Sequence, residues 1–165
     1  YDVSGVHNVA GEAEIKVYSK KYYGAKYLND GLFVSHSYYK DWEFSTRGET
    51  KIKLTFPEPK TIGAVLVYNS YDYEYAFAGL DFLEFELAEK PLWYGAGKYV
   101  PTARVSDIKF SKDFIGTAYD YIRSGSACLA SFNEIKVKSV TVSVSEKIKA
   151  SDDEIRISDI VVLGK

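Results

Sequence analysis

The chain has 165 residues, of which 46% are hydrophobic and 27% charged, and its formal net charge is −2. This length and composition predict a single globular domain spanning residues 1–165. The net charge argues against a nucleic-acid partner, which needs a basic face. No apolar run approaches the ~20 residues that cross a bilayer, so we expect no membrane insertion. The start, Tyr1–Val3, shows no signal peptide, which favours an excised or mature module, monomeric within a larger chain.

Alternation of apolar and polar residues predicts β-strands along most of the chain. Leu80–Leu87 fits a strand better than a helix, because it lacks an apolar helical stripe. Pro57–Pro59 should end the strand before it, and Asn133–Glu134 indicates a bulge or turn. A short helical turn is expected within Ser111–Arg123. The expected strands are Ala13–Tyr18, Lys51–Phe56, Ile62–Tyr68, Leu80–Leu87, Ala103–Phe110, Ala127–Phe132, Lys136–Val144 and Glu154–Leu163.

Short strands without a long helix predict an all-β fold, an antiparallel β-sandwich or jelly roll. The lysines are spread through strand-like segments and are interpreted as parts of solvated strand faces. Cys128, the single cysteine, is expected to be a small buried residue. The two histidines and the scattered carboxylates form no recognisable catalytic pattern, so we expect no enzyme.

Tyrosine is unusually frequent, with 15 residues, and aromatic residues make up 16% of the chain. Many of them fall outside the alternating segments, in Ser37–Trp42, Asn69–Phe77 and Pro91–Tyr99. Aromatic residues in loops indicate a binding surface. We expect Trp42 itself to be a core residue.

Five motifs follow one another in the chain: YGAKYLNDG at Tyr23–Gly31, Trp42 eleven residues later, TKIKLTFPEPK at Thr50–Lys60, TIGAVLVYN at Thr61–Asn69 and IRISDIVVLG at Ile155–Gly164. Their order resembles the galactose-binding-like jelly roll of discoidin or coagulation-factor type C domains and of bacterial carbohydrate-binding modules. It implies a galactose-binding domain-like antiparallel β-sandwich whose early Asp-Gly loop lies beside the last strand.

The resemblance also implies a structural calcium ion between that loop and the last strand. Asp30 and Asp159 would supply carboxylates, and oxygens near Lys26 and Ser35 would complete the site. Calcium takes six to eight oxygen ligands, many of them backbone carbonyls, and a turn rich in Asn, Asp and Gly can present these. The alternative is a plain turn, with Asp159 capping or solvated.

In such families, loops at one end of the sandwich bind the sugar. An aromatic face covers the apolar side of the ring, and polar groups pair with its hydroxyls. These positions imply a ligand-binding set of His36, Tyr38, Asn69, Tyr71, Tyr73, Tyr75, Trp93, Tyr94 and Arg123. Residues 71–77 could instead form one more strand with a tyrosine face.

The function implied is a non-catalytic carbohydrate-binding module. It would target a secreted or cell-surface bacterial protein that acts on glycans, such as a glycoside hydrolase, to its polysaccharide or glycoconjugate. The alternative is a protein-interaction or adhesion domain of the same fold without a sugar ligand.

Overall fold

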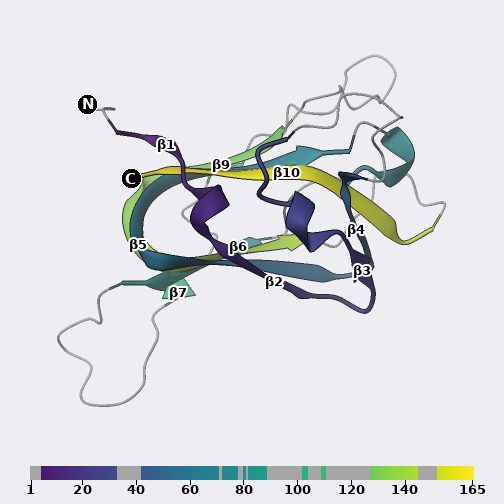
Figure 1. Ribbon diagram of the computed structural model, residues 1–165, viewed down its shortest axis with the longest axis horizontal. Coiled ribbons are helices and arrows are strands. Elements are labelled where there is room, and N and C mark those ends of the chain that lie inside the picture. The colour runs from purple at the N-terminus through teal and green to yellow at the C-terminus, as the bar shows by residue number, and fades with distance from the viewer. Residues whose placement is uncertain are drawn as a thin grey trace.

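A computed structural model describes residues 5–32, 42–70, 72–77, 80, 82–88, 102–103, 109–110, 127–144 and 152–165. Two β-layers face each other across the core, and no α-helix occurs in these ranges (Figure 1). The path through the hydrogen-bonded strands runs β3-β4-β10-β5-β9-β6-β7, all pairs being antiparallel. The predicted all-β antiparallel β-sandwich is therefore confirmed. No helix in the described part of the chain is long and apolar enough to cross a membrane.

Ten strands and three short 3-10 helices make up the described fold. The first layer contains β2 (Glu14–Tyr18), β6 (Phe82–Leu87) and β7 (Thr102–Ala103). The second contains β1 (His7–Asn8), β3 (Tyr22–Tyr23), β4 (Phe44–Arg47), β8 (Lys109–Phe110) and β10 (Glu154–Gly164). The strands β5 (Thr50–Asn69) and β9 (Ala127–Val144) run through both layers. The helices are η1 (Ala10–Glu12), η2 (Ala25–Tyr27) and η4 (Tyr73–Tyr75).

The strand β5 corrects the expectation that Pro57–Pro59 separates two strands. The chain continues as one strand, but its pairing with β9 is interrupted between Thr55 and Lys60. Proline cannot donate to the ladder, so the pairing breaks there while the chain bends from one layer into the other. The first half of β5 pairs with β2 and the second half with β10.

The strand β9, the antiparallel partner of β5, bends at the same place as β5. The register places Ile62 opposite Ile135 and Ala64 opposite Ser131, so extra residues of β9 bulge around Asn133–Glu134. The predicted irregularity is confirmed as a bulge, which joins the two strands expected here into one. Of the strand expected over Ala103–Phe110, the structure has β7 and β8 at its two ends, and residues 104–108 lie outside the described residues.

The core lies between the layers and is built from the inward side chains of the long strands. Phe44, Phe77, Phe85, Ile157 and Ile160 are among its largest fully buried members. Cys128 is buried with them, as predicted, and burial raises the pKa of its thiol. The turn expected within Ser111–Arg123 lies outside the described residues.

The two ends of the described chain are tied together. β1 pairs with β10, and the Val9 amide donates to the Val162 carbonyl at 2.8 Å. Lys165 and Thr61 exchange two backbone hydrogen bonds of 2.9 and 3.1 Å. The last strand is therefore held by residues from the beginning and the middle of the chain.

Candidate functional site

The Asn29-Asp30-Gly31 turn lies against β10, and this contact forms a clasp, defined as Leu28–Gly31 together with Asp159–Ile160. The Ile160 amide donates to the Leu28 carbonyl at 2.6 Å. The amide of Leu32 donates to Asp30 Oδ1 at 2.9 Å, and Gly31 has a φ of +75°. Gly31 thus adopts the left-handed conformation that the turn motif predicts.

The clasp buries one carboxylate completely. Asp159 is 0% exposed, and neither of its oxygens has a hydrogen-bond partner among the described residues. Desolvation by burial, with a smaller contribution from the nearby Asp30 charge, raises the pKa of Asp159 to about 7. The backbone amides of Gly31 and Ile160 have a smaller, opposite effect and lower the pKa of Asp159, because they favour its carboxylate. Neither amide forms a hydrogen bond of normal geometry with that carboxylate.

A buried carboxylate with a second carboxylate nearby fits a hard divalent cation. Buried carboxylate oxygens without a partner are rare in folded proteins, and a bound ion can supply the missing contact. No group of three or more His, Cys, Asp or Glu residues gathers among the described residues, so the remaining ligands would be neutral oxygens, which calcium accepts. Lys26 lies in η2, just before the clasp, whereas Ser35 lies outside the described residues.

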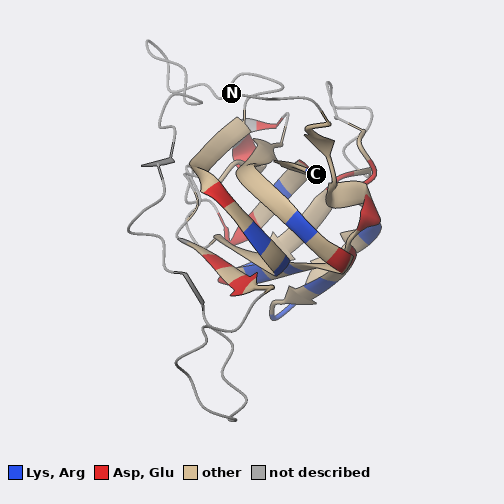
Figure 2. Ribbon diagram, turned by 90° about the vertical axis from the view of Figure 1, so that its left-hand side faces the viewer, with Lys and Arg blue, Asp and Glu red and all other residues tan. Residues whose placement is uncertain are grey.

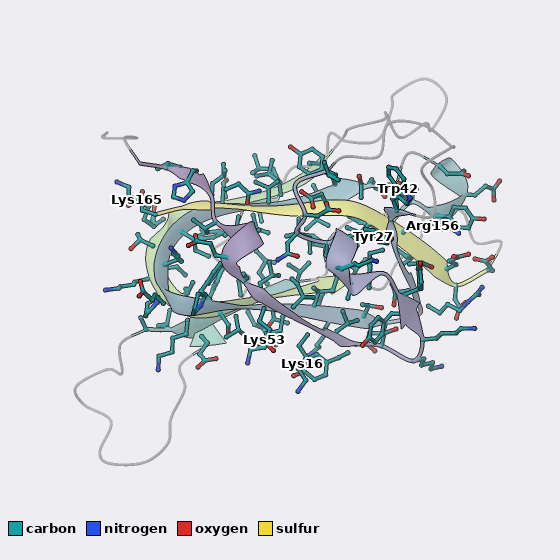
Figure 3. All side chains as sticks on the ribbon, in the orientation of Figure 1. Lys16, Tyr27, Trp42, Lys53, Arg156 and Lys165 are labelled. Carbon is teal, nitrogen blue, oxygen red and sulfur yellow. The ribbon has the colours of Figure 1, made fainter. Side chains whose placement is uncertain are left out.

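A second feature lies just before β4, where Trp42 is 54% exposed. The expectation that Trp42 is a core residue is therefore wrong. Phe44, two residues further along the chain, is fully buried and occupies the core position instead. Figure 3 shows Trp42 and Arg156 at the same end of the sandwich, beside η4.

Arg156 connects this end of β10 to η4. Its guanidinium lies over the Tyr75 ring, 4.3 Å from the ring centre, in a cation–π contact. Its Nη2 lies 3.2 Å from Glu154 Oε1, and the same oxygen accepts a 2.7 Å hydrogen bond from Ser45. We refer to Trp42, Tyr75, Glu154 and Arg156 as the Trp42 platform.

A buried polar network fixes the loop that carries Tyr75. Glu43 is 1% exposed and accepts a 2.8 Å hydrogen bond from the Ser70 hydroxyl. Asn69 donates to the Phe77 carbonyl at 3.0 Å and accepts from the amides of Ser70 and Phe77. Asn69, nominated as a ligand contact, is thus buried and positions the loop.

The structure describes only part of the nominated ligand set. Tyr75 belongs to the Trp42 platform, and the backbone of Tyr73 lies in η4, so residues 73–75 form a 3-10 turn rather than a strand. The remaining nominated residues, His36, Tyr38, Tyr71, Trp93, Tyr94 and Arg123, lie outside the described residues.

Sequence reasoning missed Arg156 and Glu43. Arg156 occupies an outward position of the alternating stretch EIRIS, which reads as an ordinary solvated strand residue. Glu43 lies between two aromatic residues, and alternation along a strand would place it on the solvent side, opposite to them. Both roles depend on a loop from elsewhere in the chain, which the local pattern does not show.

Comparisons with known proteins identify the fold. No family model matches the sequence, and no curated protein matches it. A family 32 carbohydrate-binding module of C. perfringens NanJ, solved in complex with galactose, is 9% identical with a TM-score of 0.62, over 96% of this chain and 98% of that chain. An F5/8 type C domain from Bacteroides fragilis is 13% identical with a TM-score of 0.57, over 100% and 95% of the two chains.

A chitosan-binding module of a chitosanase/glucanase from Paenibacillus sp. IK-5 is 12% identical with a TM-score of 0.57, over 94% of this chain and 98% of that chain. The chain thus has the galactose-binding-like jelly-roll fold of F5/8 type C domains and family 32 carbohydrate-binding modules. It resembles non-catalytic binding modules of glycan-active enzymes. At these identities the similarity establishes the fold alone.

Proposed function

We propose that this domain is a non-catalytic carbohydrate-binding module that binds a neutral sugar at the Trp42 platform. The observation that carries the proposal is the half-exposed Trp42 at the same end of the sandwich as the stacked Tyr75–Arg156 pair. An indole face covers the C–H side of a pyranose, and Arg156 with Glu154 offers donors and acceptors for hydroxyls. The fold supports this proposal, since solved domains of similar structure were crystallised with sugars.

The charge of the platform supports a neutral ligand. Arg156 is paired with Glu154, and Arg47 nearby is paired with Asp153 at 2.9 Å. An anionic sugar would gain little from cations that are already neutralised. Fixed pairs of a donor and an acceptor suit vicinal hydroxyls instead.

A glycan array probed with the intact domain tests the proposal. The wild type should retain a defined set of neutral glycans, and Trp42→Ala should lose them at equal protein concentration. Tyr18→Ala, which removes a 47% exposed ring from the other layer, is the matched control and should bind like the wild type. Binding of no glycan, or equal binding by Trp42→Ala, would contradict the proposal and favour the protein-interaction alternative.

The same fold supports a proposal on the parent protein. We propose that the module belongs to a secreted or cell-surface bacterial protein that acts on glycans, and that it brings this protein to its substrate. Modules of this fold occur beside catalytic domains, as in the chitosanase/glucanase and in C. perfringens ZmpB. A full-length parent that loses retention on its polysaccharide after Trp42→Ala, with unchanged turnover of a small soluble substrate, would support it.

We further propose that the clasp holds a structural calcium ion through Asp30 and Asp159. The ion would compensate the buried Asp159 carboxylate, whose oxygens have no hydrogen-bond partner among the described residues, together with the nearby Asp30 charge. Because it binds the folded state alone, it should raise the melting temperature of chelator-treated protein as its concentration rises. Asp30→Ala should abolish that rise, whereas an unchanged melting temperature of the wild type on adding Ca²⁺ would count against the site.

A further inference from the structure

An uneven distribution of charge sets residues 15–29 apart from the rest of the chain. This segment contains no Asp or Glu, although the whole chain has a net charge of −2. At the bend of the sandwich, by contrast, acidic and basic residues are interspersed (Figure 2). The charged and aromatic residues of the segment, which we call the tyrosine–lysine edge, are Lys16, Tyr18, Lys20, Lys21, Tyr22, Tyr23, Lys26 and Tyr27.

The edge is open to solvent. Tyr18, Tyr22 and Tyr23 are 47%, 49% and 61% exposed, and they are three of the five large hydrophobic side chains that stand out as exposed among the described residues. All four lysines of the edge are exposed as well. Aromatic rings that face solvent on an ordered strand are available to a ligand.

Within the described part of the chain, the cations of the edge have no carboxylate partners. No described Asp or Glu lies within ion-pair distance of the ammonium groups of Lys16, Lys20, Lys21 and Lys26. Two of them contact aromatic rings instead, Lys16 over Tyr18 at 5.2 Å and Lys26 over Tyr27 at 5.0 Å from the ring centres.

The neighbouring strand adds to the positive charge. Lys16 lies directly opposite Lys53, and Tyr18 lies opposite Lys51, in the pairing of β2 with β5 (Figure 3). Lys53 forms an ion pair with Glu86 at 3.6 Å, so its charge is partly compensated, whereas that of Lys16 is compensated by no described carboxylate. Like charges directly opposite each other destabilise a sheet, and a bound anion relieves that cost.

The backbone of the edge is held in place. The Ser19 hydroxyl lies 2.7 Å from the Thr46 hydroxyl and donates to the carbonyls of Lys21 and Arg47. β3 pairs with β4, and η2 packs against β2. The lysines and tyrosines thus project from an ordered surface, which lowers the entropy cost of binding.

We propose that the tyrosine–lysine edge is a second binding surface, for an acidic polysaccharide that carries carboxylate or sulfate groups. Lys16 and Tyr18 project from the same face of β2, and the Lys16 ammonium lies 5.2 Å from the centre of the Tyr18 ring. The two side chains thus form one contact surface, on which a sugar ring can meet the tyrosine while its anionic group pairs with the ammonium. The edge exposes tyrosine rings and no long aliphatic side chain, which favours a sugar chain over the interior of a lipid bilayer.

The proposal is tested with the whole domain and three immobilised polymers: heparin, polygalacturonate and neutral dextran. The wild type should be retained by the two acidic polymers and released as salt rises, because screening weakens these contacts. Dextran should not retain it. The variant K16Q/K20Q/K21Q/K26Q should lose at least tenfold in affinity.

The matched control is K60Q/K136Q/K138Q/K165Q, which removes the same number of charges elsewhere and should keep at least half the affinity. An equal loss in both variants would mean that net charge alone acts, and would overturn the proposal. Binding to phosphatidylserine vesicles or to duplex DNA without binding to either acidic polymer would also overturn it. Y18A, whose charge is unchanged, should weaken binding several-fold, and its thermal unfolding should match that of the wild type.

The edge and the Trp42 platform are tested independently of each other. Trp42→Ala should leave retention on heparin unchanged, and the four-lysine variant should leave neutral-glycan binding unchanged. If one of the two surfaces shows no binding, the proposal for the other surface is therefore unaffected.

Discussion

At the scale of single residues, Asp159 makes the metal-free fold sensitive to pH. Its pKa is about 7 in the folded protein, against 3.8 for an ordinary Asp, so the folded state binds the additional proton between these values. The favourable contribution of Asp159 to the free energy of unfolding is therefore fully present below about pH 4. This contribution decreases by up to about 1.4 kcal/mol per pH unit as the pH rises from 4 to 7, and it changes no further above pH 7.

Asp159→Asn tests this dependence, since the amide stays neutral at every pH. In calcium-free buffer, urea unfolding of the wild type should show stability decreasing from pH 5 to pH 7, and the variant should lose most of this slope. Asp153→Asn, at an exposed position paired with Arg47, is the control and should keep it. A wild-type stability that stays level or rises over this range would show that Asp159 is not buried as a neutral acid.

Trp42 shows what a local pattern leaves undecided. If the strand began at Trp42, then Trp42 and Phe44 would lie on the same side of it and both would face the core. The structure buries Phe44 and exposes Trp42, because β4 begins only at Phe44, which pairs with Ile157, and Trp42 precedes the strand. That pairing joins residues more than a hundred positions apart.

At the scale of elements, Asn69 organises the loop that carries Tyr75. Its side chain satisfies the buried backbone groups of Phe77 and the amide of Ser70. Asn69→Ala leaves these groups unpaired, so the free energy of unfolding should decrease by about 2–4 kcal/mol, measured by urea denaturation.

The exposed Asn133 on the β9 bulge provides the control, and Asn133→Ala should cost less than about 1 kcal/mol. Asn69→Ala should also weaken glycan binding, because Tyr75 is no longer held beside Arg156. Unaltered stability of Asn69→Ala would mean that the loop does not depend on this side chain.

Gly164 sits where the last strand meets the bend of β5. A Cβ atom added to Gly164 would collide with the Thr61 carbonyl oxygen, and that backbone is held by two hydrogen bonds to Lys165. Gly164→Ala should therefore lower the melting temperature strongly, by more than about 8 °C for a domain of this size.

Gly48→Ala is the comparison, since its φ is +71° but nothing lies within 4 Å of the added atom. It should cost about 1–2 kcal/mol from backbone strain alone. Differential scanning calorimetry measures both, and equal melting temperatures for the two variants would contradict the close packing at Gly164.

At the scale of the whole molecule, the sequence predicts the sandwich because the alternation of apolar and polar residues is a reliable sign of strands. It predicts the contact between Asp30 and β10 through the resemblance of motif order, and the structure places these two carboxylates close enough to interact. The continuity of β5 and β9 could not be predicted, since proline and polar residues mark the end of a strand as readily as a bend. The contact of Arg156 with Tyr75 and that of Glu43 with Ser70 could not be predicted either, because Ser70 and Tyr75 come from a distant part of the chain.

Sugar binding at the Trp42 platform is tested most directly by titration calorimetry with the neutral glycan that the array retains best. The wild type should bind one equivalent, Trp42→Ala should bind at least tenfold more weakly, and Tyr18→Ala should match the wild type. Equal affinities for the wild type and Trp42→Ala, with both proteins folded, would contradict a sugar site at this platform.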